Sequence, residues 1–121
     1  IKNSKFNENT ALMDGGSIFS EKAAVHIMNS SFDQNISNEY GGAITNNQGV
    51  LEINDCTLKQ NYANFGGAIA SLGLINMANI IFSMNSAKTN GGGVWLYSKD
   101  FIASNNCQFT DNYPNDVYTD Q

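Results

Sequence analysis

The chain repeats itself about every 25 residues, and this repeat limits the folds open to it. Each copy has an Asn or Asp, then a large apolar residue three positions later, then an Asn after three more. The apolar residues are 26, 26, 24 and 27 residues apart, at Phe6, Phe32, Leu58, Phe82 and Phe109. A pair of glycines follows each of the first four copies, beginning at Gly15, Gly41, Gly66 and Gly91. Four and a half copies in phase indicate a solenoid.

The apolar segments between the turn residues are short and alternate with a period of two, as in residues 50–53 and 93–97. They are rich in β-branched and aromatic residues, and Asn, Asp, Ser and Gly bound them, which is typical of strands between turns. Helical repeats of about 33–47 residues would need longer apolar stretches with a period of 3.6. About three short strands per repeat predict an all-β parallel β-helix of about five coils, with about 4.8 Å between coils.

Two columns of asparagine are expected along this solenoid. In stacked coils each turn lies over the same turn of the next coil, where a left-handed backbone and a side-chain hydrogen bond favour Asn. Stacked amides can donate and accept along the axis. We predict one structural ladder at Asn3, Asn29, Asp55, Asn79 and Asn106, and a second at Asn9, Asn35, Asn61, Asn85 and Asn112. Asn64 serves as a contrast, because we expect it to have no partner in a column.

The remaining columns predict the core and the corners. Phe6, Phe32, Leu58, Phe82 and Phe109 should stack inside the coils, and the glycine pairs should mark a corner that only Gly fits. Cys56 and Cys107 share an inward slot two coils apart. Their expected separation of about 9.6 Å is twice the strand spacing and exceeds the limit for a disulfide. We therefore expect two free thiols.

Composition excludes several classes of function. The net charge is −5 and none of the six basic residues is Arg, whereas nucleic-acid binding needs a basic face. No apolar run approaches 18 residues, so no membrane span is expected in this segment. Charged residues make up only 14%, and the 19 asparagines supply much of the polarity instead.

The copy at residues 56–69, Cys-Thr-Leu-Lys-Gln-Asn-Tyr-Ala-Asn-Phe-Gly-Gly-Ala-Ile, resembles a known repeat. It is similar to the repeat of the chlamydial-type polymorphic outer-membrane proteins, which belong with the pectin-lyase-like proteins. The resemblance extends over the whole chain. It implies a right-handed parallel β-helix, an extracellular or cell-surface location, and an adhesive or scaffolding role.

A polysaccharide-processing enzyme and a carbohydrate-binding module are the alternatives to a structural or adhesive segment. Lyases resembling the superfamily use Arg or Lys as a base, and this chain has no Arg. Glycoside hydrolysis needs two carboxylates a few ångströms apart, which neighbouring coils could supply. No expected column holds two acidic residues in adjacent coils; Asp33, for example, lies between Asn7 and Lys59. We therefore expect no catalytic residue, no metal site and no cofactor.

A few single residues are candidates for surface roles. Trp95 is out of phase with Val94 and is our candidate for an outward contact residue, and we expect Tyr40 and Phe65 to stack on each other. His26 is expected to face solvent or to have a hydrogen-bond partner. The glycosylation sequons begin at Asn29 and Asn35, of which we favour Asn35.

The ends of the sequence suggest what the partners are. Ile1 already belongs to an inward column, so we expect an excerpt of a longer repeat protein, whose partners are flanking coils, another protein chain or glycans. After Asn112 the glycine pair is missing and Pro114 removes a backbone donor. We interpret this last coil as a variant coil rather than a cap.

Overall fold

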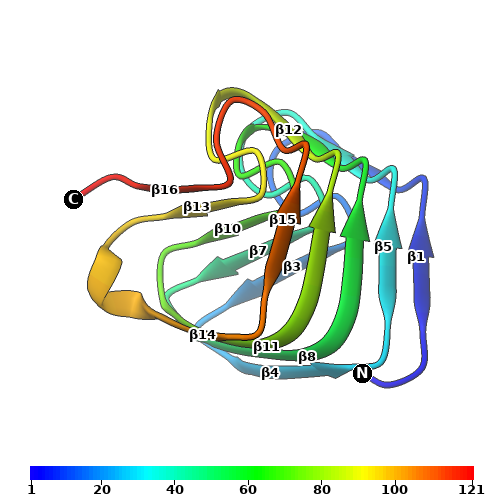
Figure 1. Ribbon diagram of the computed structural model, residues 1–121, viewed down its shortest axis with the longest axis vertical. Coiled ribbons are helices and arrows are strands. Elements are labelled where there is room, and N and C mark those ends of the chain that lie inside the picture. Colours follow the sequence, from blue (N-terminus) through cyan, green and yellow to red (C-terminus); the bar gives the residue numbers. More distant parts are fainter.

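The chain winds into stacked coils whose strands pair only with the equivalent strands of neighbouring coils (Figure 1). The computed structural model describes all residues from Ile1 to Gln121 and is a parallel β-solenoid. Each pairing between strands is parallel and joins residues 23 to 27 positions apart, as in Val94 with Val117 and Phe82 with Phe109. The all-β parallel β-helix predicted from the repeat is therefore confirmed.

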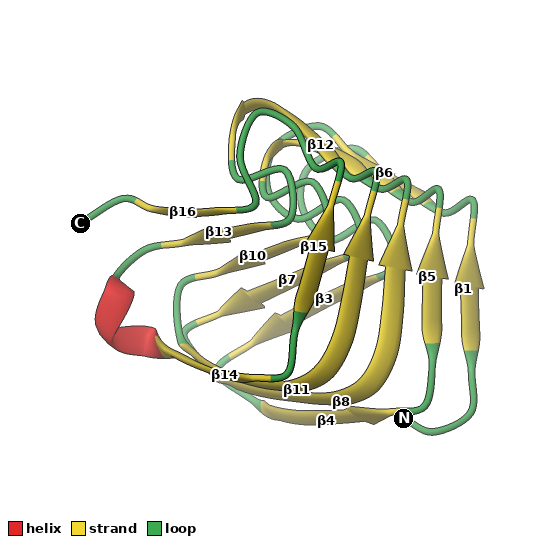
Figure 2. Ribbon diagram, in the orientation of Figure 1, coloured by secondary structure: helices red, strands yellow, loops and turns green.

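Three sheets form the walls of the solenoid (Figure 2). The seven-stranded sheet contains β1 (Lys5–Asn7), β4 (Ala24–Met28), β5 (Ser31–Asp33), β8 (Val50–Lys59), β11 (Leu74–Ser83), β14 (Ile102–Asn105) and β15 (Gln108–Thr110). The four-stranded sheet contains β2 (Thr10–Ala11), β6 (Ile36–Ser37), β9 (Tyr62–Phe65) and β12 (Ser86–Asn90). The five-stranded sheet contains β3 (Ile18–Glu21), β7 (Ile44–Asn47), β10 (Ile69–Ser71), β13 (Val94–Leu96) and β16 (Val117–Thr119).

The seven-stranded sheet bends where each coil passes its first turn. β8 and β11 run continuously through this bend, and they curve from the base of the solenoid into its right-hand wall in Figure 1. In other coils the same bend separates two strands, as Asn29 separates β4 from β5. The single helix is a 3-10 turn at Lys99–Phe101, and no helix is long and apolar enough to cross a membrane.

The interior is filled by columns of apolar side chains. Phe32, Leu58 and Phe82 are fully buried, whereas Phe6 and Phe109 in the outer coils are half-buried. The ring centroids of Phe6 and Phe32 are 4.8 Å apart, and those of Phe82 and Phe109 are 4.7 Å apart. The expected stack is thus confirmed, and it fixes the register of the coils. A second inward column runs through Leu51, Ile75 and Ile102, which are partners in adjacent strands.

Glycine is required at the corner for two reasons. The first glycine of each pair is left-handed, with φ between 62° and 71° at Gly15, Gly41, Gly66 and Gly91. The second lies directly against the next coil: a Cβ on Gly42 would overlap the carbonyl oxygen of Gly67. Ala at the second glycine would force the coils apart, and Ala at the first would strain a left-handed backbone.

The fifth coil continues all three walls despite its altered sequence. β14 and β15 pair with β11, β16 pairs with β13, and Tyr113 bridges Ser86. The carbonyl that accepts from the first glycine in earlier coils is replaced here by the side chain of Asn115, whose Oδ1 accepts from Gly91 N at 2.6 Å. This coil therefore has the form of a variant coil.

Candidate functional site

The second asparagine column is a buried ladder of amides. Asn35, Asn61 and Asn85 are fully buried. The Oδ1 of Asn61 accepts from both the backbone N (2.9 Å) and Nδ2 (3.0 Å) of Asn35. The Nδ2 of Asn61 donates to Asn85 Oδ1 at 2.9 Å and to the carbonyl of Phe32 at 3.1 Å. Each interior amide thus satisfies its own hydrogen-bonding groups and those of its neighbours.

The ladder extends over all five coils. Asn9 donates to Asn35 Oδ1, and Asn85 donates to Asn112 Oδ1, with the same paired geometry at 3.0 Å. At the last rung, Asn112 Nδ2 donates to Asp116 Oδ1 at 3.2 Å, where earlier rungs use the next asparagine. The left-handed residue is the one before the ladder position, such as Gln34 or Gln60. Our expectation that these asparagines themselves need a left-handed backbone is therefore wrong.

The first asparagine column has the left-handed backbone that was expected for a stacked turn. All five members, Asn3, Asn29, Asp55, Asn79 and Asn106, are left-handed with φ between 48° and 57°, and all are exposed. Nδ2 of one residue donates to Oδ1 of the residue in the preceding coil at three of the four steps. These bonds are Asn29 to Asn3 (2.7 Å), Asn79 to Asp55 (3.0 Å) and Asn106 to Asn79 (2.8 Å). No such bond joins Asp55 to Asn29.

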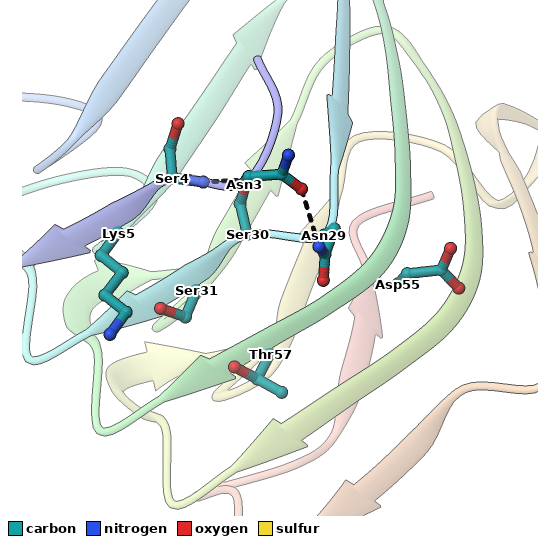
Figure 3. Close-up of a pocket in the computed structure, with 8 residues that line it drawn as sticks. All are labelled: Asn3, Ser4, Lys5, Asn29, Ser30, Ser31, Asp55 and Thr57. Atoms are coloured by element: carbon teal, nitrogen blue, oxygen red, sulfur yellow. Dashed lines mark hydrogen bonds between the residues drawn. The ribbon is translucent and has the colours of Figure 1, made fainter.

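A polar groove lies beside this interruption (Figure 3). It has a volume of about 330 Å³ and is lined by Asn3, Ser4, Lys5, Asn29, Ser30, Ser31, Asp55 and Thr57, none of them hydrophobic. Figure 3 shows the side chains of Lys5, Ser31 and Thr57 along one side and those of Asn3, Asn29 and Asp55 along the other. The first three occupy equivalent positions in successive strands. The asparagine column was predictable from the repeat, whereas this row of Lys, Ser and Thr, one position before the Phe column, varies in residue type and gives no such signal.

The structure corrects the prediction for Trp95. Its side chain is 5% exposed, so it is not an outward contact residue. The ring of Tyr40 packs edge-on against it at 5.1 Å, and that of Phe65 lies 6.0 Å away. Tyr40 and Phe65 stack at 5.1 Å, as expected. Trp95 does point out of the central core, but these two residues from the neighbouring turn cover it.

The two sequon asparagines have opposite environments. Asn35 is fully buried and its amide nitrogen makes two hydrogen bonds within the ladder, so it cannot carry a glycan in the folded chain. Asn29 is exposed, and its amide nitrogen makes one hydrogen bond. The preference for Asn35 over Asn29 is therefore wrong, because the ladder uses the amide that a glycan would need.

The remaining reactive side chains are dispersed. His26 is exposed; its Nε2 lies 3.0 Å from Asn54 Nδ2 and 4.0 Å from Glu52 Oε2. Cys56 and Cys107 are free thiols, as expected, and burial raises the pKa of the Cys56 thiol. Burial also raises the pKa of the Tyr40 phenol, with smaller contributions from nearby Asp14, Glu39 and Asp120. The structure contains no group of three or more His, Cys, Asp or Glu side chains that could hold a metal ion.

A comparison with protein families matches part of the chain. Residues 29–48 match the Chlamydia polymorphic membrane protein repeat. This segment holds one copy of the motif, from Asn29 through Phe32 and Asn35 to the glycine pair at Gly41. The resemblance to the polymorphic membrane protein repeat is thus confirmed, and the match lies within one coil of the solenoid. No curated protein and no solved structure matches the chain significantly.

Proposed function

We propose that the chain is a non-catalytic structural or adhesive segment of an extracellular or cell-surface repeat protein. The buried amide ladder is the main observation in support. The interior amides Asn35, Asn61 and Asn85 use their polar atoms to hold neighbouring coils together, so the interior serves stacking rather than chemistry. A ligand or partner would then bind the outer surface, as in other solenoids.

The match to the polymorphic membrane protein repeat supports a surface location, because that family is described as a membrane protein of Chlamydia. The match lies within one coil, whereas the same motif recurs in each of the first four coils of this chain. We infer that the segment belongs to an exposed repeat region. Flanking coils or another protein chain would be its partners.

The register of the strands disfavours a polysaccharide-cleaving enzyme. Asp33 faces Asn7 on one side and Lys59 on the other, and Glu52 faces His26 and Asn76. Glycoside hydrolysis needs two carboxylates about 5 to 9.5 Å apart. A carbohydrate-binding module is the better second candidate, because the polar groove offers free polar groups to a ligand.

Labelling of intact cells tests the proposed location. An antibody raised against residues 1–121 should stain intact cells of the source organism as strongly as permeabilised ones. Beads coated with the chain should adhere to a cell or matrix surface more than albumin-coated beads do. Staining only after permeabilisation would contradict the surface location, and cleavage of any polysaccharide in a panel would contradict the non-catalytic role.

A further inference from the structure

The exposed asparagine column lacks one hydrogen bond because one of its members is an aspartate. At the other steps an amide Nδ2 donates to an oxygen in the preceding coil. Asp55 has no nitrogen in its side chain, so it cannot donate to Asn29. Asn29 donates to Asn3 through its own Nδ2, and no side chain donates to Asn29 Oδ1. Asp55 accepts from Asn79 through Oδ1 alone. Asn29 Oδ1 and Asp55 Oδ2, in neighbouring coils, are therefore left without hydrogen-bond partners.

The other free groups of the polar groove lie opposite these two acceptors (Figure 3). Lys5, Ser31 and Thr57 make no side-chain hydrogen bond or ion pair within the chain and occupy successive strands. They supply an ammonium donor and two hydroxyl groups that donate or accept. Ser4 and Ser30, by contrast, bond backbone carbonyls through their hydroxyls. The groove therefore presents an ammonium group and two hydroxyls on one side and the two free acceptor oxygens on the other.

These groups define the chemistry of a ligand. The ligand must donate hydrogen bonds to two oxygens one coil apart, a separation of about 4.8 Å, and accept them from Lys5. A divalent cation takes six or more oxygen ligands and is favoured by several carboxylates, whereas the groove has one carboxylate and one ammonium group. Neighbouring hydroxyls of a sugar ring both donate and accept, and they carry no charge. We propose that the polar groove is a saccharide-binding site in which sugar hydroxyls bridge Asn29 and Asp55.

This site would supply the ligand-binding surface for the proposed adhesive function, and it rests on that function. Its natural ligand would be a sugar of a surface glycan. The groove is open and lacks an aromatic platform, so one saccharide unit should bind weakly, in the millimolar range. The next side chain of the Lys5, Ser31 and Thr57 row is Ile81, which is 44% exposed and offers an apolar contact to a longer glycan. Binding should therefore strengthen with the number of sugar units.

The test is titration of the 121-residue chain, isotopically labelled, with methyl glycosides of glucose, galactose, mannose and N-acetylglucosamine and with their short oligomers. At least one saccharide should shift the backbone amide signals of the coils around Asn29, Ser31 and Asp55. Asp55→Asn should weaken this binding about tenfold or more, because the introduced amide can donate to Asn29 Oδ1 and fill the missing step. The same variant should melt at a higher temperature than the natural chain.

Asp111→Asn is the matched control. Asp111 is also an exposed, left-handed turn residue, but it does not line the groove, so this change should leave saccharide binding unaltered. Shifts at the groove caused by Ca²⁺ alone, or no shift with any saccharide, would overturn the inference. Equal loss of binding in both variants would also overturn it. Adhesion of chain-coated beads without any saccharide binding would leave the proposed function intact and reject only this site.

Discussion

Asparagine has two separate uses at the scale of single residues, and backbone conformation distinguishes them. In the exposed column the residue itself is left-handed, and few residues other than Gly, Asn and Asp accept that conformation readily. In the buried ladder the preceding residue is left-handed, and Asn is needed because its amide both donates and accepts. Asp55 is therefore compatible with the first column, whereas an Asp in the ladder would lack the donor.

The ladder predicts a large cost for removing an interior amide. Asn61→Ala leaves the donors of Asn35 without their acceptor and also deprives Asn85 of a donor. A buried group without its partner costs about 1–3 kcal/mol, so the free energy of unfolding in urea should fall by at least that amount. Asn64 is not the partnerless contrast that we expected, since Thr89 donates to its Oδ1 at 2.6 Å.

Asn38 is the better control, because it is exposed and makes no side-chain hydrogen bond within the chain. Asn38→Ala should change the free energy of unfolding by no more than about 0.5 kcal/mol. Similar losses for Asn61→Ala and Asn38→Ala would contradict the structural importance of the ladder.

Glycosylation should discriminate between the two sequons. When the chain is secreted from a eukaryotic host that attaches N-linked glycans, we expect a glycan on Asn29 and none on Asn35 of the folded product. Peptide mass spectrometry of the secreted chain measures the occupancy of each site. An Asn29→Gln variant should be secreted without a glycan, and a folded product carrying a glycan on Asn35 would contradict the buried ladder.

Alkaline pH should destabilise the fold, first through the buried thiol of Cys56. Burial holds the pKa of Cys56 above its ordinary value of 9.0, so the native state favours the neutral thiol. The unfolded chain loses this proton first, and the stabilisation is present below pH 9.0 and lost as the pH rises through the folded pKa. The pKa of Tyr40 is also raised in the folded state, so this group likewise lowers the stability as the pH rises above 10.0.

The measurement is urea unfolding between pH 8 and pH 10 for the natural chain and Cys56→Ala. The variant should lose less stability over this range than the natural chain does. Cys107→Ala is the matched control, because Cys107 is only half-buried in the outer coil. An unchanged alkaline loss in Cys56→Ala would show that the thiol is not responsible.

At the scale of elements, the column of Phe and Leu side chains packs neighbouring coils together along the seven-stranded sheet. Phe32 in β5 lies between Phe6 in β1 and Leu58 in β8 and is fully buried. Phe32→Ala should therefore lower the free energy of unfolding by about 3–5 kcal/mol. Phe19→Ala in β3 removes a ring that is 49% exposed, so its effect should be much smaller. A loss below about 1 kcal/mol for Phe32→Ala would show that this site is not core.

Strand register was predictable from the sequence because each column recurs at a fixed offset. The positions of Phe32, Leu58 and Phe82 follow directly from the repeat, as do the glycine corners. Contacts between different columns have no such signal. Burial of Trp95 depends on the turn that brings Tyr40 and Phe65 over it, and periodicity within one strand does not reveal that cover. The polar groove depends likewise on two columns meeting at a bend.

At the scale of the whole molecule, the strands of the first coil are hydrogen-bonded along one edge only. β1, β2 and β3 pair with β5, β6 and β7, and their opposite edges have no partner strand. Apolar side chains are exposed at the same end, with Leu12 82%, Met13 64% and Phe19 49% exposed. Unpaired strand edges beside apolar surface favour association with another strand. We propose that a further coil or a neighbouring chain covers this end in the native assembly.

The behaviour of residues 1–121 alone in solution tests this last proposal. The chain should self-associate through the open end, so its sedimentation coefficient and its melting temperature should both rise with protein concentration. Leu12→Lys together with Met13→Lys should reduce this association, because two charges then lie on the exposed apolar surface without removing a core side chain. A soluble monomer with one cooperative melting transition that is independent of concentration would show that the first coil is stable without a partner.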